Sequence, residues 1–142
     1  MFGKMFSAFA DMLKDAVASL ESNLEKVKTQ DTLNRVAGVA WLVAKADGDA
    51  DADERQKFMD IVARSCPAFG PEDAKAAWVR AEGMNDGQIY REIAMANAEE
   101  AELLVRVGVG LGGADGDFDD DEKAIVKKIA TDAFLNPKEF GL

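Results

Sequence analysis

The chain has 142 residues, of which 48% are hydrophobic and 31% are charged, and its formal net charge is −10. This length and this balance are typical of one globular domain with its own core, and they exclude a disordered chain. The acidic excess argues against a nucleic-acid partner, which would require clustered Lys and Arg. Cysteine occurs once and histidine is absent, so neither an intrachain disulfide nor a zinc site of Cys and His can form.

Two features bear on the location of the protein. The longest apolar run, 36–44, is too short to span a bilayer. The N-terminal segment is apolar, but charged residues interrupt it, which is not typical of a cleaved signal peptide. We therefore expect a cytoplasmic protein that is at most peripheral to the inner membrane.

Apolar residues recur at three- and four-residue spacing along the chain, which is typical of α-helices. Residues 1–30 are expected to form an N-terminal amphipathic segment, with one long helix at 2–28. Further helices are expected to follow in chain order. The second ends at about Ala46, the third runs from Asp51 to near Cys66, and the fourth runs from Pro71 to Gly83. The fifth runs from about Gln88 to a break near Asn97, the sixth ends at about Gly113, and the seventh runs from Asp119 to near Phe134, before a short turn at 138–140. No stretch alternates with period two. The sequence therefore predicts an all-α fold, a single helical domain of about seven helices.

Several positions carry more specific expectations. Asp31 or Thr32 is expected to cap the second helix, and residues 85–87 (Asn-Asp-Gly) are expected to form a turn. The stretch 108–113 contains four glycines, so either another segment approaches the backbone closely there or the helix ends early. Three aromatic residues lie on apolar stripes and are expected to be largely buried: Trp41, Trp78 and Phe134.

Two stretches, which we call the first acidic segment (47–54) and the second acidic segment (115–122), are copies of one motif 68 residues apart. Each begins with Asp-Gly-Asp after an alanine and ends on a glutamate followed by a basic residue. Together they hold 11 of the 27 acidic residues, and without them the chain would be nearly neutral. The surrounding apolar residues align as well. We therefore expect a domain over 31–142 built from two pseudo-symmetric halves, 31–66 and 99–135.

Helix capping explains some of these carboxylates but not all of them. Asp47 and Asp115 lie at the C-terminal end of the preceding helix, where the helix dipole disfavours a negative charge by about 0.3–1 kcal/mol. The later carboxylates lie at the start of the next helix and suit N-caps and capping boxes: Asp51, Glu54, Asp119 and Glu122. The density of charge in each segment also exceeds what capping requires.

Clustered carboxylates without His or Cys select hard ions such as calcium or magnesium. Neither segment is an EF-hand loop, because Phe58 and Val126 stand where the bidentate glutamate would be. A cation would need ligands shared between the two segments. The candidate metal ligands are Asp47, Asp49, Glu54, Asp115, Asp117 and Glu122. A cation site and solvated helix caps are both compatible with the sequence.

Three stretches resemble the TerB family of tellurite-resistance proteins: Leu104-Val-Arg-Val-Gly108, Ala114-Asp-Gly-Asp-Phe-Asp-Asp-Asp-Glu-Lys123 and Asn136-Pro-Lys-Glu-Phe-Gly-Leu142. Residues 33–62 also fit the family's Asp-Gly…Glu signature. The resemblance implies an all-helical domain of two pseudo-symmetric halves, cytoplasmic or loosely membrane-associated. It also implies a metal-binding role for Asp47, Glu54, Asp115 and Glu122. Ala50 departs from the bulky apolar residue usual in the family, which the second segment keeps as Phe118.

These observations support one leading hypothesis and two alternatives. We expect a non-enzymatic tellurite-resistance or stress-response module whose acidic segments bind a divalent cation, a basic protein partner, or both. As the resemblance implies, its partners would be other tellurite-resistance proteins, including membrane-bound ones. One alternative is a peripheral membrane adaptor acting through residues 1–30, with weak or indirect membrane contact. The other is a metal-dependent hydrolase, although the chain lacks histidine, a nucleophile constellation and a phosphate-binding loop.

Overall fold

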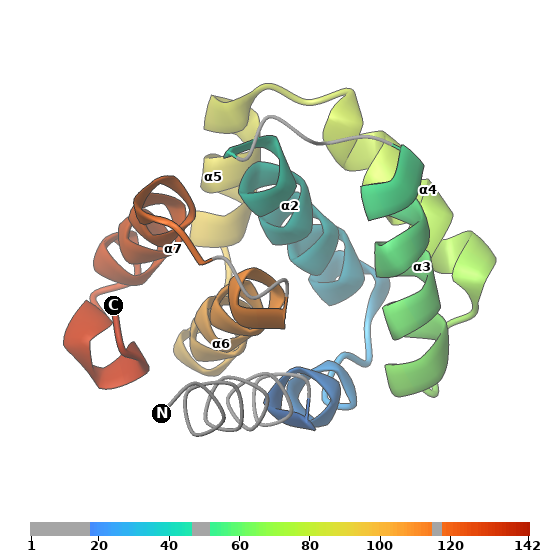
Figure 1. The fold of residues 1–142 in the computed structure, drawn as a ribbon, viewed down its shortest axis with the longest axis horizontal. Helices are drawn as coiled ribbons and strands as arrows, with labels where there is room; N and C mark the ends of the chain where they lie inside the picture. Colours follow the sequence, from blue (N-terminus) through green and yellow to red (C-terminus); the bar gives the residue numbers. More distant parts are fainter. Residues whose placement is uncertain (1–17, 47–51, 115–117) are drawn as a thin grey trace, which may run out of the picture.

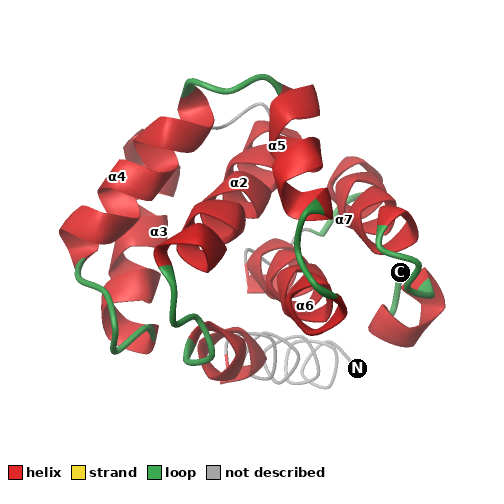
Figure 2. Ribbon diagram, turned by 180° about the vertical axis from the view of Figure 1, so that it is seen from behind, coloured by secondary structure: helices red, strands yellow, loops and turns green. Residues whose placement is uncertain are grey.

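The computed structural model describes residues 18–46, 52–114 and 118–142, and all regular structure within these ranges is helical (Figures 1 and 2). The prediction of an all-α domain is confirmed. None of the helices in these ranges is long and apolar enough to cross a bilayer. Residues 18–24 are helical, and the elements that follow are α2 (Gln30–Ala46), α3 (Ala52–Ser65), α4 (Pro71–Glu82), α5 (Asp86–Ala94), α6 (Ala98–Ala114), α7 (Asp120–Asp132) and the 3-10 helix η1 (Pro137–Phe140).

α2 is the central helix of the domain, and α4, α5, α6 and α7 pack around it (Figure 1). A helix that is apolar around most of its circumference is stable only inside a core. Gly38 allows a close fit to α5, because a Cβ there would lie 2.9 Å from Ile89 Cγ2. The buried residues of α2 are Leu33, Val36, Ala37, Gly38, Val39, Ala40, Leu42 and Val43.

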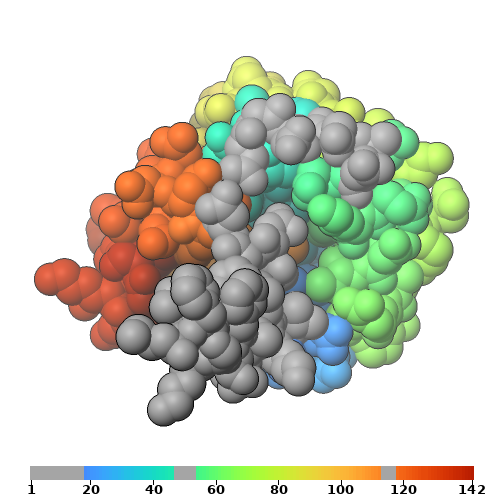
Figure 3. Space-filling model, viewed as in Figure 1, coloured from blue at the N-terminus to red at the C-terminus, as the bar shows by residue number. Residues whose placement is uncertain are grey.

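The two halves predicted from the repeat differ in how their helices pack. α7 packs along α6, whereas α3 packs against α4. On the face seen in Figure 3, α3 (green) and α7 (orange to red) form opposite flanks. The superposition of residues 36–61 on residues 104–129 stays a prediction.

Trp78 joins α2, α3 and α4. Its side chain is 1% exposed, and its ring centroid lies 5.5 Å from that of Phe58 and 5.7 Å from that of Trp41. The two indole rings meet edge to face, an arrangement that places a ring edge on the π face of its partner. The expected burial of Trp78 is confirmed. Trp41 is half-buried, and its Nε1 is enclosed without a hydrogen-bond partner among the described residues.

The connection into α2 differs from the prediction. The helix at 18–24 ends at Leu24, not at residue 28, and a turn follows it. Thr29 caps α2, because its Oγ1 accepts the Thr32 N–H at 3.2 Å. The prediction of Asp31 or Thr32 as the N-cap was therefore wrong. Both residues lie in the first turn of the helix, where Asp31 still suits the positive end of the dipole.

The boundaries of α4 agree with the sequence, and the start of α5 does not. α4 begins at Pro71 and Gly83 follows its last residue, as expected. The expected turn at residues 85–87 is instead the start of α5. Asn85 caps this helix through reciprocal hydrogen bonds with Gln88, of 2.8 and 2.9 Å. The same Asn-Asp-Gly composition suits both a turn and a helix N-terminus, and the glutamine that completes the capping box decides between them.

The glycines of α6 do not end the helix, which continues to Ala114. They allow neighbouring helices to approach the backbone. A Cβ at Gly108 would lie 3.0 Å from Val126 of α7 and 3.3 Å from Val39 of α2. A Cβ at Gly110 would lie 3.0 Å from Leu20. The first of the two expectations for this stretch, close approach, is therefore confirmed.

Phe134 is exposed, and the prediction that it is buried was wrong. Its side chain is 98% exposed, and its φ of 62° lies in the left-handed region that glycine usually occupies. α7 ends two residues earlier, so the helical stripe on which the prediction relied does not reach Phe134. The change of backbone direction after the helix turns the ring away from the core.

Two arginines connect helices that are distant in sequence. Arg35 of α2 donates to the Glu92 carbonyl at 3.0 Å and to Glu100 Oε1 at 2.8 Å. Arg80 of α4 donates two hydrogen bonds to the Glu92 carboxylate, of 2.7 and 2.6 Å. These bonds to Arg80 lower the pKa of Glu92, an effect that burial opposes and the charges of Arg80 and Arg35 reinforce. The network links α2, α4, α5 and the start of α6.

The Arg80–Glu92 pair predicts a pH-dependent contribution to stability. Because the pKa of Glu92 is lower in the folded protein, the contribution is complete above the unfolded value of about 4.3 and is lost as the pH falls through the folded pKa. Arg80→Gln is therefore expected to lower the free energy of unfolding at pH 7, by at most about 1 kcal/mol for this partly exposed pair. The difference from the parent should shrink below about pH 4.

Urea denaturation of both proteins between pH 3 and pH 7 measures this difference. Arg91→Gln is a matched control, because the Arg91 guanidinium donates to the carbonyl of Gly87 within its own helix and forms no ion pair in the described part of the chain. A difference between parent and Arg80→Gln that does not change with pH would contradict the role of Glu92.

Candidate functional site

α2 and α6 run in the same direction, so that the last residues of both helices lie at one end of the domain. Near the start of both helices, Arg35 bonds to Glu100, and further along a Cβ on Gly108 would lie 3.3 Å from Val39 Cγ1. The contacts thus follow the same order on both helices. Each helix continues for about two turns, roughly 10 Å, beyond the second contact. The acidic segments follow the last residues of these helices.

Glu122 is a buried carboxylate at this end, with 1% of the residue exposed. It forms a capping box with Asp119, whose Oδ1 accepts the Glu122 N–H at 2.9 Å, while Glu122 Oε1 accepts the Asp119 N–H at 3.3 Å. Asp120 and Asp121 are exposed in the first turn of α7, where the helix dipole favours negative charge. The capping expected for the second acidic segment is therefore confirmed.

Glu54, the equivalent residue of the first acidic segment, is in a different environment. Its side chain is 24% exposed, and it pairs with Lys57 at 3.3 Å. Lys57 itself is 64% exposed. An ion pair this accessible to solvent contributes little to stability. The glutamates that end the two segments are therefore equivalent in sequence but not in burial.

Four of the predicted metal ligands lie outside the described residues: Asp47, Asp49, Asp115 and Asp117. The structure therefore places only Glu54 and Glu122 of the predicted set. In the described ranges, no group of three or more His, Cys, Asp or Glu side chains is arranged to hold a metal ion. The shared cation site stays a prediction, as does the capping role of Asp51.

Phe118 anchors the second acidic segment to α6. A Cβ on Gly112 would overlap the Phe118 ring, so the glycine makes room for it. Lys123 lies over the same ring, 5.8 Å from its centroid. In the first half of the repeat, the positions equivalent to Gly112 and Phe118 are Ala44 and Ala50. The exchange of glycine and phenylalanine for two alanines distinguishes the two halves at this point.

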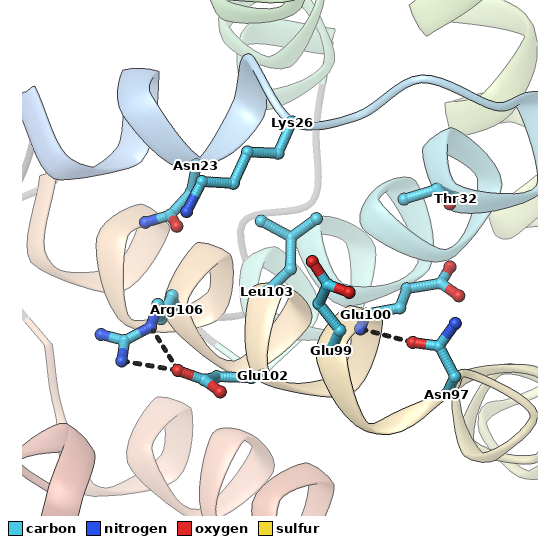
Figure 4. A pocket seen from close by; sticks show the side chains of 9 residues that line it. All are labelled: Asn23, Lys26, Thr32, Asn97, Glu99, Glu100, Glu102, Leu103 and Arg106. Carbon is cyan, nitrogen blue, oxygen red and sulfur yellow. Dashed lines mark hydrogen bonds and ion pairs between the residues drawn. The ribbon is translucent and has the colours of Figure 1, made fainter.

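A polar hollow of about 340 Å³ lies between the helix at 18–24 and the first half of α6 (Figure 4). Three carboxylates and two bases are among the residues that line it. Glu102 is paired with Arg106 at 2.8 Å, and Glu100 is paired with Arg35. Lys26 and Glu99 also border the hollow. The side chains that line the hollow do not form a nucleophile with an adjacent base.

The only cysteine of the chain is not suited to nucleophilic chemistry. Cys66 is buried, and its Sγ donates to the Leu24 carbonyl at 3.1 Å. Burial raises the pKa of its thiol to about 11, and the charge of Lys28 only partly opposes this. A thiol in this environment stays protonated near neutral pH and is inert.

The described residues define an all-helical domain in which repeated acidic segments connect the helices of each half. The chain belongs to the TerB family, because the family described as tellurite resistance protein TerB matches residues 32–142. The resemblance of the three motifs is thus confirmed. The family is generally a non-catalytic domain related to tellurite resistance. Comparisons with curated proteins and with solved structures found no match.

Proposed function

We propose that this protein is a non-enzymatic tellurite-resistance module whose two acidic segments together bind a divalent cation, calcium or magnesium. In this proposal the segments form one acidic end of the domain, to which a basic partner protein also docks. The basic partners in this proposal are other tellurite-resistance proteins, including membrane-bound ones, and the module itself is cytoplasmic.

The parallel course of α2 and α6 is the observation that carries this proposal. Because both helices end on the same side of the domain, we expect the eleven carboxylates of the two acidic segments, which follow these helices in the sequence, to lie in one region. Oxygen ligands without nitrogen or sulfur suit hard cations. The buried position of Glu122 supports the proposal further, because a carboxylate held in place by its cap is pre-organised.

The proposal predicts stabilisation by divalent ions. At matched ionic strength, the melting temperature should rise with the concentration of calcium or magnesium and not with sodium. Ligand binding to the folded state alone adds about 2.7 kcal/mol when the free ion is at 100 times its Kd. Asp47→Asn with Asp115→Asn should reduce this gain and leave the ion-free protein as stable as the parent, or more so, because two unfavourable contacts with helix dipoles are removed.

A second double variant, Asp31→Asn with Asp60→Asn, makes the same change in net charge on exposed residues outside the acidic segments. It should keep the full response to the divalent ion. Identical melting curves in sodium, magnesium and calcium would rule out the cation and leave the acidic end as a docking surface for a basic protein.

A further inference from the structure

An exposed phenylalanine stands beside an apolar hollow where α5 and α7 end and α6 begins. We call Phe134 and this hollow the apolar end. The hollow has a volume of about 290 Å³. Its walls are mostly apolar and include Ile93 and Ala94 of α5, Ala98 and Ala101 of α6, and Ile129 of α7, with Phe134 on its edge. A contiguous exposed apolar patch marks an interaction site, whereas a single exposed apolar residue does not. Here the ring and the hollow lie together and form one patch.

The backbone at Phe134 favours glycine. Leu135 N–H donates to the Ala130 carbonyl at 2.9 Å and Phe134 N–H donates to the Thr131 carbonyl at 3.1 Å, which together form a Schellman motif. In this motif the residue at the left-handed position is usually glycine, because a side chain is strained there. Neither the local backbone nor the core of a single chain therefore accounts for a phenylalanine at this position. A contact outside the chain would account for it.

The apolar end is also far from the acidic end. α6 has 17 residues and is about 25 Å long, and the apolar end is at its start while the second acidic segment follows its last residue. This separation exceeds the Debye length of about 8 Å at physiological ionic strength. Asp132 borders the hollow, and it is paired with Lys128 at 3.0 Å. A second copy of this acidic chain would therefore meet little repulsion here.

We propose that two copies of the chain associate through the apolar end across a twofold axis, with Phe134 of each copy in the hollow of the other. A projecting ring and a hollow on the same patch have the self-complementarity that such an interface requires. One aromatic side chain buries about 150–250 Å². Two rings and their hollows therefore remain below the roughly 1,200–2,000 Å² of a stable interface. The dimer is accordingly weak and depends on concentration.

Sedimentation velocity of the full chain between 1 μM and 1 mM, with and without EDTA and at low and high sodium chloride, tests this proposal. The dimer fraction should rise with concentration and should persist at high salt, because the contact is apolar. Phe134→Gly and Ala94→Glu, which alter the ring and the hollow separately, should each weaken association at least about tenfold. Val79→Ser, which changes a 49% exposed residue on α4, should not.

Thermal melting at 1 μM shows whether a variant that no longer associates is still folded. Phe134→Gly should melt at the parent's temperature or higher, because glycine suits the left-handed backbone. A parent that is monomeric up to 1 mM would overturn the proposal and leave Phe134 to a different protein. Association that Phe134→Gly does not change, or that EDTA abolishes, would also overturn it. The last result would assign the contact to cations bridging acidic ends.

Discussion

Replacing Trp78 by alanine is expected to lower the free energy of unfolding by about 3–5 kcal/mol, the usual cost of truncating a buried tryptophan. This is a large part of the roughly 5–15 kcal/mol by which a domain of this kind is stable. Trp78 is 1% exposed and lies between Phe58 and Trp41, so alanine would leave a cavity where α2, α3 and α4 meet. Urea denaturation followed by far-UV circular dichroism measures the loss without relying on tryptophan fluorescence.

Val79→Ala is the matched control for this variant. Val79 is the next residue of α4, but it is 49% exposed and lies outside the aromatic cluster. Its replacement is expected to change the free energy of unfolding by no more than about 0.5 kcal/mol. Similar losses for the two variants would contradict the role of Trp78 in joining the three helices.

Replacing Arg35 by methionine is expected to cost about 2–3 kcal/mol, since it leaves two groups without their charged donor. Arg35 and Glu100 are largely buried, with side-chain exposures of 13% and 14%, and Arg35 also bonds to the Glu92 carbonyl. Methionine preserves much of the packing of the aliphatic stem, so the loss reports mainly on the missing hydrogen bonds. Urea denaturation at pH 7 measures it.

Two glutamates of α6, Glu100 and Glu102, allow a buried ion pair and an exposed ion pair to be compared within one helix. Glu100→Gln removes the charge opposite Arg35 and is expected to cost about 1–3 kcal/mol. Glu102→Gln removes an exposed i,i+4 pair with Arg106, in which both side chains are 48% exposed, and is expected to cost at most about 0.5 kcal/mol. Equal losses at the two positions would show that burial does not strengthen the Arg35–Glu100 pair.

Local patterns were sufficient to predict most of the helices. The start of α4 at Pro71 and its end before Gly83 follow from residues that act within one turn of the helix. The capping box of Asp119 and Glu122 is local in the same way. The errors at Asp31 and at residues 85–87 are shifts within one helical turn, where neighbouring polar residues compete for the capping position.

Phe134 shows where periodicity fails as a guide to burial. Its spacing from Ile129 and Ala130 continues the apolar stripe of α7, but the helix ends before it and the backbone turns into the left-handed region. The exposure of this residue is thus decided by the hydrogen bonds that close the helix. A phenylalanine at the position where glycine usually ends a helix would indicate an exposed ring. The sequence alone does not show where α7 ends.

The sequence by itself determined the all-α class, the positions of the acidic segments and the family, because helix periodicity, charge clustering and short motifs are all local properties. Only the tertiary structure decided that α2 and α6 run in parallel, and so that both helices end on the same side of the domain. The same holds for the Arg35 network and for the hollow beside Phe134. These features depend on contacts between residues tens of positions apart, which form only when the apolar faces of several helices are buried together in one core.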